Sequence, residues 1–172
     1  VGAVPGSHAV ALEYGSAAAL AAISSMRGEL AGVLVEPVPV GRQGELAPRE
    51  FLNAVREVTT EMGVALILDE VRSGFRAHPG GAQALFGVQA DIAVYGKVAG
   101  GGLPIGIVAG SAKYLEDTHH GGTPLALAAA RAVLQRLRDD GPALQRGLNQ
   151  RTTAFAERLR TVGTELEAPV RI

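Results

Sequence analysis

Short apolar runs alternate with longer amphipathic stretches along the chain. The runs are bounded by glycine, proline or carboxylate residues, as buried strands are, and lie at residues 31–38, 64–71, 91–96 and 105–110. Stretches with apolar residues at helical spacing lie at residues 17–30, 48–63, 124–141 and 143–163. Because strands that are apolar throughout alternate with helices, the pattern predicts an α/β fold with a mainly parallel sheet covered on both faces.

Two of the predicted helices have clear signals. Pro48 suits the first turn of one helix, and Gly63 suits its end. In the last predicted helix, one face is formed by Leu144, Leu148, Phe155, Leu159 and Val162. Both helices are therefore predicted to be amphipathic.

Polar side chains lie where two of the predicted strands end. Glu36 follows the first strand, and Asp69 and Glu70 follow the second. Parallel sheets bind ligands beyond the carboxyl ends of their strands. The carboxylate pair therefore indicates either a binding site at this edge or a cap on a helix or turn, and the sequence pattern leaves both open.

A single lysine interrupts the small, apolar, glycine-rich segment AVYGKVAGGGLPIG at residues 93–106. Lys97 is one of two lysines in the chain, and no other charged residue lies between Asp91 and Lys113. Apolar surroundings disfavour the charged form of an amine and make it a nucleophile toward carbonyl groups. Pyridoxal phosphate uses a lysine that binds its aldehyde as an imine and a carboxylate that keeps its pyridine nitrogen protonated. Lys97 and Asp69 are therefore the candidate pair for this cofactor.

Other interpretations of the glycines and histidines fit less well. A GxxxxGK[ST] phosphate loop fails on both sides of Gly96–Lys97, and a GxGxxG fingerprint fails because Ile105 stands where the last glycine is required. Adjacent histidines such as His119–His120 point apart on most backbones, and no third ligand lies at a useful spacing. No metal site is predicted.

Composition narrows the class of protein further. The 16 basic and 17 acidic residues leave a net charge of −1, which gives no electrostatic basis for binding nucleic acid or an anionic membrane. The absence of cysteine excludes disulfides and thiolate catalysis. No apolar run approaches the ~20 residues of a membrane-spanning helix, and the first residues do not resemble a signal peptide. We therefore predict a cytoplasmic protein with no nucleic-acid or membrane partner.

Five segments carry a family resemblance: LVEPV (34–38), LAPREFL (46–52), LILDEVRSGFR (66–76), GGAQALFGVQADIAVYGKVAGGGLPIG (80–106) and PLALAAARAVL (124–134). Together they resemble the class III pyridoxal-phosphate-dependent aminotransferases, in the branch of glutamate-1-semialdehyde aminomutase. The phrases HPGGAQALFGV and YGKVAGGGLPIG are most similar to aminotransferase domains of polyketide and nonribosomal peptide synthases. The resemblance covers about residues 10 to 160 and implies a fold-type-I large domain, partial in this chain.

The resemblance also implies roles for individual residues. Lys97 matches the Schiff-base lysine, Asp69 the partner of the pyridine nitrogen, and Val71 the residue packed on one face of the ring. Glu36 matches the glutamate of the family's Glu-Pro strand end, in a structural or supporting role. The small residues around Lys97 are expected to let the backbone approach the cofactor closely.

The sequence departs from the family pattern at two places near the expected site. Arg72 stands where many relatives carry a glutamine near the phenolic oxygen of the cofactor. The segment between Tyr114 and Pro124 is much shorter than in the family, where it includes a threonine that binds the phosphate of the neighbouring subunit. Thr118 is the candidate for that contact, although neither it nor Thr123 aligns with the family threonine.

The implied activity is amino transfer in a homodimer. An amino donor aminates the cofactor, which then aminates a carbonyl acceptor such as a β-ketoacyl thioester on a carrier protein. One alternative is glutamate-1-semialdehyde 2,1-aminomutase, and another is a non-catalytic remnant that serves as a structural or interaction module. Residues 1–172 are expected to be the central part of the large domain of a longer chain, without its N-terminal phosphate-loop region and C-terminal small domain, and inactive in isolation.

Overall fold

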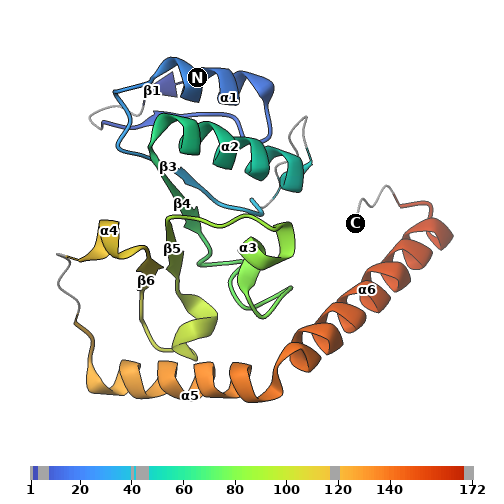
Figure 1. Cartoon of the computed structure of the whole chain (residues 1–172). Coiled ribbons are helices and arrows are strands. Elements are labelled where there is room, and N and C mark those ends of the chain that lie inside the picture. Colours follow the sequence, from blue (N-terminus) through green and yellow to red (C-terminus); the bar gives the residue numbers. More distant parts are fainter. Residues whose placement is uncertain (1, 4–7, 40, 42–46, 117–120, 169–172) are drawn as a thin grey trace.

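The computed structural model describes residues 2–3, 8–39, 41, 47–116 and 121–168. Its strands are β1 (Gly2–Ala3), β2 (Val10–Ala11), β3 (Gly32–Val35), β4 (Ala65–Asp69), β5 (Ile92–Tyr95) and β6 (Ile107–Gly110). Its helices are α1 (Ala17–Ser25), α2 (Pro48–Met62), α3 (Gly81–Phe86), the 3-10 turn η1 (Lys97–Gly100), α4 (Ala112–Leu115), α5 (Pro124–Asp140) and α6 (Pro142–Glu165) (Figure 1). The predicted strands and long helices all form; the sequence pattern does not predict β1, β2, α3 or α4.

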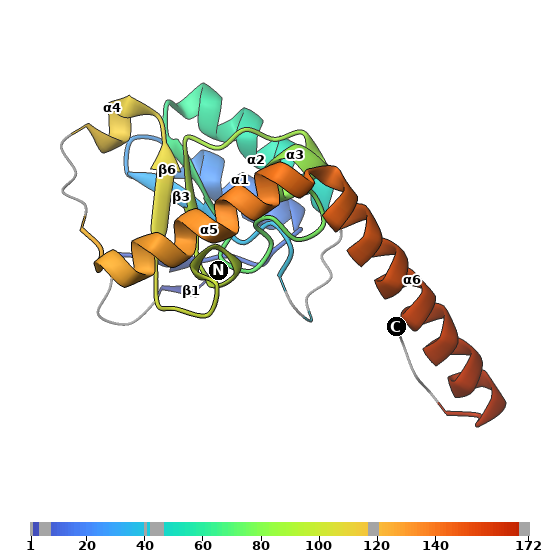
Figure 2. The ribbon, with the colours of Figure 1, turned by 90° about the horizontal axis from the view of Figure 1, so that it is seen from below.

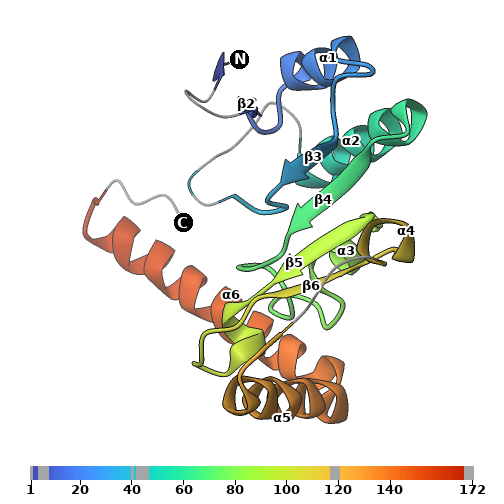
Figure 3. The same ribbon diagram turned by 90° about the vertical axis from the view of Figure 1, so that its left-hand side faces the viewer.

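The main sheet has the strand order β3-β4-β5-β6 (Figure 3). β3, β4 and β5 are parallel, whereas β6 runs antiparallel to β5. A parallel connection needs a crossover of roughly a dozen or more residues, usually a helix. The segment between β5 and β6 holds only the short turn η1 and a loop, so the chain returns alongside β5. The predicted mainly parallel α/β sheet is confirmed, with one antiparallel edge.

The hydrophobic core lies between β4 and the helix pair α1 and α2. Its buried members are Ala19, Ile23, Phe51, Leu52, Val55, Leu66, Leu68 and Val88. The amphipathic pattern of α2 explains this placement, because its apolar face packs inward and its ends have the predicted signals. Pro48 is in the first turn, and Gly63 closes the helix in the left-handed conformation with φ 68°.

The opposite face of the sheet is open in the described part of the chain. Strand register places Leu34, Ile67, Val94 and Val108 on this face, since paired residues share a side of the sheet. Leu34 is 67% exposed and Val108 is 46% exposed. Within the described residues, α1 and α2 therefore cover one face of the sheet, and the other face stays largely open. The physical reason is that α5 packs against the turn η1 rather than across this face.

Helix α6 projects away from the rest of the molecule (Figures 1 and 2). The residues of its predicted apolar face are all exposed, from 36% at Leu148 to 63% at Phe155. Near its start, α6 contacts the loop between β4 and α3 through buried Gln145. No helix within the described ranges is long and apolar enough to cross a membrane.

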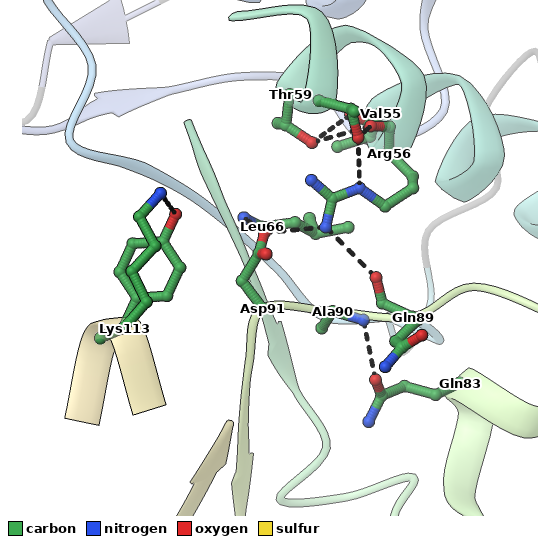
Figure 4. Close-up of polar contacts among 11 residues, drawn as sticks. Val55, Arg56, Thr59, Leu66, Gln83, Gln89, Ala90, Asp91 and Lys113 are labelled. Carbon is green, nitrogen blue, oxygen red and sulfur yellow. Dashed lines mark hydrogen bonds and ion pairs between the residues drawn. The ribbon is translucent and has the colours of Figure 1, made fainter. Parts of the chain in front are cut away.

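A polar network fixes α2 to the start of β4 and β5 (Figure 4). Arg56 Nη1 lies 2.8 Å from Asp91 Oδ2, and the same oxygen accepts a hydrogen bond from the Leu66 N–H at 2.8 Å. Burial raises the pKa of Asp91, but the Leu66 and Arg56 hydrogen bonds and the charges of Arg56 and Lys113 outweigh it, so the pKa lies below its ordinary value. The ionised carboxylate therefore stabilises the folded state.

Asp91→Asn is expected to lower the free energy of unfolding by about 1–3 kcal/mol at neutral pH, because it removes a charge-assisted hydrogen-bond acceptor. A folded-state pKa below the unfolded one contributes stability above the unfolded pKa, and this contribution is lost as pH falls through the folded value. Urea unfolding should therefore show the difference between wild type and Asp91→Asn shrinking as the pH falls from roughly 5 toward 3. Asp139→Asn is the control, since Asp139 is exposed and, among the described residues, pairs with its neighbour Arg138. A difference that stays constant with pH would contradict the assignment.

Candidate active site

The two carboxylates at the end of β4 have different environments. Asp69 is the last residue of the strand and lies on the open face of the sheet, paired in register with Val94 of β5. Its side chain is half-buried, and Oδ1 accepts a hydrogen bond from the Val71 N–H at 3.0 Å. Its position at the carboxyl edge of a parallel strand is the one at which such sheets bind ligands.

Glu70 is 1% exposed and serves as a structural anchor. Its carboxylate accepts hydrogen bonds from the Ser73 hydroxyl at 2.8 Å, the Ala82 N–H at 2.8 Å and the Gln83 N–H at 3.0 Å. Two of these donors belong to the first turn of α3, so Glu70 caps that helix. The cap interpretation is thus correct for Glu70, and it leaves Asp69 as the carboxylate available to a ligand.

Gly81 is required where α3 begins against Glu70. Its φ is 71°, and a Cβ there would lie 2.6 Å from Glu70 Oε1. The carboxylate cannot retreat without breaking its hydrogen bonds to the Ala82 and Gln83 N–H groups. Gly63 has a similar φ of 68°, but a Cβ there would meet nothing within 4 Å. An alanine at Gly63 would therefore add backbone strain alone, whereas an alanine at Gly81 would add backbone strain and a steric clash.

Gly81→Ala is expected to destabilise the protein by about 1–3 kcal/mol more than Gly63→Ala. Both variants carry the cost of a left-handed alanine, roughly 1–2 kcal/mol. Only Gly81→Ala also displaces the buried Glu70 carboxylate. Urea unfolding of the two variants side by side measures the difference. Equal losses would show that Glu70 moves freely and does not anchor α3.

Lys97 lies beside the end of β4 because β4 and β5 are adjacent parallel strands. It follows β5 after Gly96, opens the turn η1, and has a φ of 44°, which is unusual for a residue other than glycine. Its side chain is exposed. The expectation of a dry, apolar setting for this amine is therefore wrong in the described structure: the turn directs the side chain into an open cavity that two arginines also line.

The glycines after Lys97 serve the packing of the chain on itself. A Cβ at Gly100 would lie 2.8 Å from Ile105 Cγ2, and a Cβ at Gly101 would lie 2.8 Å from Val133 Cγ2 of α5. Gly101 also has a φ of 58°. These glycines let α5 and the following loop press against the turn that carries Lys97, a role that the sequence pattern did not indicate.

A cavity of about 420 Å³ opens beyond the carboxyl ends of β3, β4 and β5. Its polar lining consists of Arg72, Ser73, Arg76 and Lys97. Its apolar lining consists of Val38, Ala77, Ala82 and Leu85. This volume is within the usual range for small-molecule sites. A second cavity, of about 460 Å³, lies between α5 and residues 105–107 and is mostly apolar.

The loop that carries Arg72 and Arg76 is held at both ends. At its start, Glu70 bonds Ser73, as described above. Further along, Gln145 and Asn149, one turn apart on α6, donate hydrogen bonds to the carbonyl groups of Phe75 at 3.0 Å and Ala77 at 2.9 Å. No sequence pattern predicts these anchors, which join positions about 70 residues apart.

The aromatic pair Phe75 and Tyr95 connects this loop to β5. Their ring centroids are 5.2 Å apart, and the Gln83 amide donates to the Tyr95 hydroxyl at 3.0 Å. Burial raises the pKa of the Tyr95 phenol, and the nearby Glu70 carboxylate raises it further, while the Gln83 hydrogen bond acts in the opposite direction. Tyr95 therefore remains protonated and helps to fix the strand that leads to Lys97.

The remaining predicted site residues are placed as follows. Val71 is half-buried beside Gly96: a Cβ on that glycine would lie 3.5 Å from Val71 Cγ1. Glu36 Oε1 lies 3.7 Å from Arg72 Nε. Thr123 caps α5 by accepting a hydrogen bond from the Ala126 N–H at 3.3 Å. Thr118 and His119–His120 lie outside the described residues.

The chain belongs to the class III aminotransferase family, since residues 8–172 match the model of aminotransferase class-III. It is 37% identical to the glutamate-1-semialdehyde 2,1-aminomutase of Chloroflexus aggregans over 95% of its length, and 38% identical to that of Aquifex aeolicus over 91%. It covers 40% and 39% of those proteins, respectively. Class III aminotransferases use pyridoxal phosphate.

Solved structures agree with this assignment. A transaminase with PLP bound superposes with a TM-score of 0.75 at 31% identity, over 87% of this chain and 37% of that one. An omega-transaminase from Sphaerobacter thermophilus gives a TM-score of 0.60 at 36% identity, over 70% of this chain and 30% of that one. The predicted fold class, part of a PLP-transferase large domain, is confirmed.

Proposed function

We propose that this chain carries the catalytic lysine, Lys97, and the ring-nitrogen partner, Asp69, of a pyridoxal-phosphate-dependent aminotransferase or aminomutase. The observation that supports the proposal is their placement. They follow adjacent parallel strands at the same edge of the sheet, where an open cavity presents the amine. Family membership supports the reaction class, and the placement of Asp69 and Lys97 supports the choice of residues.

The side chains at this edge fit the chemistry of the cofactor. When bound, pyridoxal phosphate acts as an electron sink for carbanion chemistry at an amino-bearing carbon. Asp69 would hold a proton on the pyridine nitrogen, and Val71, on the neighbouring loop, would pack against the ring. Lys97 Nζ would bind the cofactor aldehyde as an imine and, when released, move a proton at the substrate carbon.

The substrates of such an enzyme are an amino donor and a carbonyl acceptor. The sequence resemblance to synthase domains favours a β-ketoacyl thioester on a carrier protein as the acceptor. The curated relatives favour a second candidate, glutamate-1-semialdehyde 2,1-aminomutase activity. We also propose a homodimer, a cytoplasmic location, and correspondence of this chain to the central part of a large domain. The two activities are separated by assaying the holoenzyme with a β-ketoacyl thioester and an amino donor, and separately with glutamate 1-semialdehyde.

Borohydride reduction tests the lysine assignment directly. After incubation with pyridoxal phosphate and reduction, the adduct is expected on the peptide that contains Lys97, because its amine lines the cavity. Lys113 is an internal control: its Nζ lies 3.1 Å from the Tyr114 hydroxyl on α4, and Lys113 is not among the residues that line the cavity. Peptide mapping by mass spectrometry distinguishes the two sites. Equal labelling of Lys97 and Lys113 would reject a specific role for Lys97.

A further inference from the structure

The cavity at Lys97 is cationic on one side and apolar on the other. Of the described residues that line it, Arg72, Arg76 and Lys97 carry positive charge, and none carries a carboxylate. Glu70, the fully buried carboxylate at the start of the loop, is occupied by its hydrogen bonds to Ser73, Ala82 and Gln83. Like charges gathered in one cavity repel one another, so this arrangement is stabilised by an anion.

The two arginines have donors available for such an anion. Among the described residues, the Arg72 guanidinium has one ion-pair partner, Glu36, and the separation of 3.7 Å is too long for a hydrogen bond. Within the described ranges, the Arg76 guanidinium makes neither an ion pair nor a hydrogen bond. A guanidinium offers several N–H donors in a planar fork that suits carboxylate and phosphate oxygens.

The loop is also fixed in place before any ligand binds. Glu70 anchors its start, and Gln145 and Asn149 of α6 hold the carbonyl groups of Phe75 and Ala77, on either side of Arg76. Because the backbone is held, the ordering cost of binding is confined to the arginine side chains themselves. Next to them, Val38 and Leu85 are 46% and 37% exposed and give the cavity its apolar wall.

We infer that Arg72 and Arg76 form an anion-binding subsite beside Lys97, and that its ligand joins an anionic group to a short apolar segment. This inference rests on the proposed function only in placing the reacting group at Lys97. The shared chemistry is an anionic oxygen group, which could belong to the carboxylate of a substrate or to the phosphate of the cofactor. A guanidinium hydrogen bond to either group is charge-assisted and strong.

The test compares each anionic probe with a counterpart that lacks the anionic group. Calorimetry measures the affinity of the holoenzyme for valerate and for its neutral amide, valeramide. Absorbance titration measures the affinity of the apoprotein for pyridoxal phosphate and for pyridoxal. The variants are Arg72→Gln and Arg76→Gln. Arg131→Gln is the matched control, because Arg131 is an exposed arginine that lines the other cavity.

In either variant, the affinity for one anionic probe is expected to fall about tenfold or more, while the affinity for the matching neutral probe is unchanged. Arg131→Gln is expected to leave all four affinities unchanged. A loss confined to valerate assigns the subsite to a substrate carboxylate, and a loss confined to pyridoxal phosphate assigns it to the cofactor. Unchanged affinities for both anions in both variants would overturn the inference, as would equal losses of charged and neutral probes. Borohydride labelling of Lys97 is read in parallel, so a failure of the subsite is distinguished from a failure of the proposed function.

Discussion

Lys97→Ala is expected to reduce amino transfer by the holoenzyme by about a thousandfold or more, because under the proposed assignment it would lose both the covalent attachment of the cofactor and the proton carrier. Lys97→Arg should be equally inactive, since a guanidinium stays protonated and cannot act as a nucleophile. The backbone gives a reason to prefer these substitutions to Lys97→Gly. Lys97 has a φ of 44°, so glycine would also change the strain in the turn.

The controls for this prediction separate chemistry from folding. Lys113→Ala should retain normal turnover, since Lys113 lies on α4 and bonds the Tyr114 hydroxyl. A small primary amine added to Lys97→Ala should restore part of the activity by replacing the missing proton carrier. If urea unfolding shows that Lys97→Ala is folded and its turnover is near normal, Lys97 has no role in the mechanism.

Asp69→Asn is expected to reduce turnover roughly a hundredfold or more, while leaving borohydride labelling of Lys97 intact. An amide cannot keep the pyridine nitrogen protonated as a carboxylate does, and each unit of pKa mismatch there corresponds to ~1.4 kcal/mol. The turn at the end of β4 should survive, because the asparagine Oδ1 can still accept the Val71 N–H bond that Asp69 accepts at 3.0 Å. The variant thus tests charge at nearly constant shape.

Glu70→Gln provides the comparison for Asp69→Asn. Its buried carboxylate accepts three hydrogen bonds, so its replacement should lower the free energy of unfolding by about 1–3 kcal/mol. Asp69→Asn should instead change turnover with little change in stability. If Asp69→Asn loses stability and keeps turnover, Asp69 is a structural cap like its neighbour.

The amino-acid sequence by itself determined where the strands and long helices lie. Apolar runs of strand length and amphipathic stretches are local patterns, so they predicted β3 to β6 and α1, α2, α5 and α6 to within a few residues at most ends. The same apolar runs placed Asp69 and Lys97 at or just after the ends of two predicted strands, but that these strands are neighbours is known only from the β4–β5 pairing.

Only the tertiary structure decided what each polar or glycine residue does. Adjacent residues of a strand point to opposite sides, so the fold buried Glu70 as the cap of α3 and left Asp69 on the open face. The crowding of Gly100 and Gly101 by Ile105 and Val133 depends on contacts between distant segments, as does the hold of α6 on the Arg72–Arg76 loop. The local sequence pattern shows the chemistry of a residue. The contacts that the residue makes depend on the packing of elements that are far apart in the sequence.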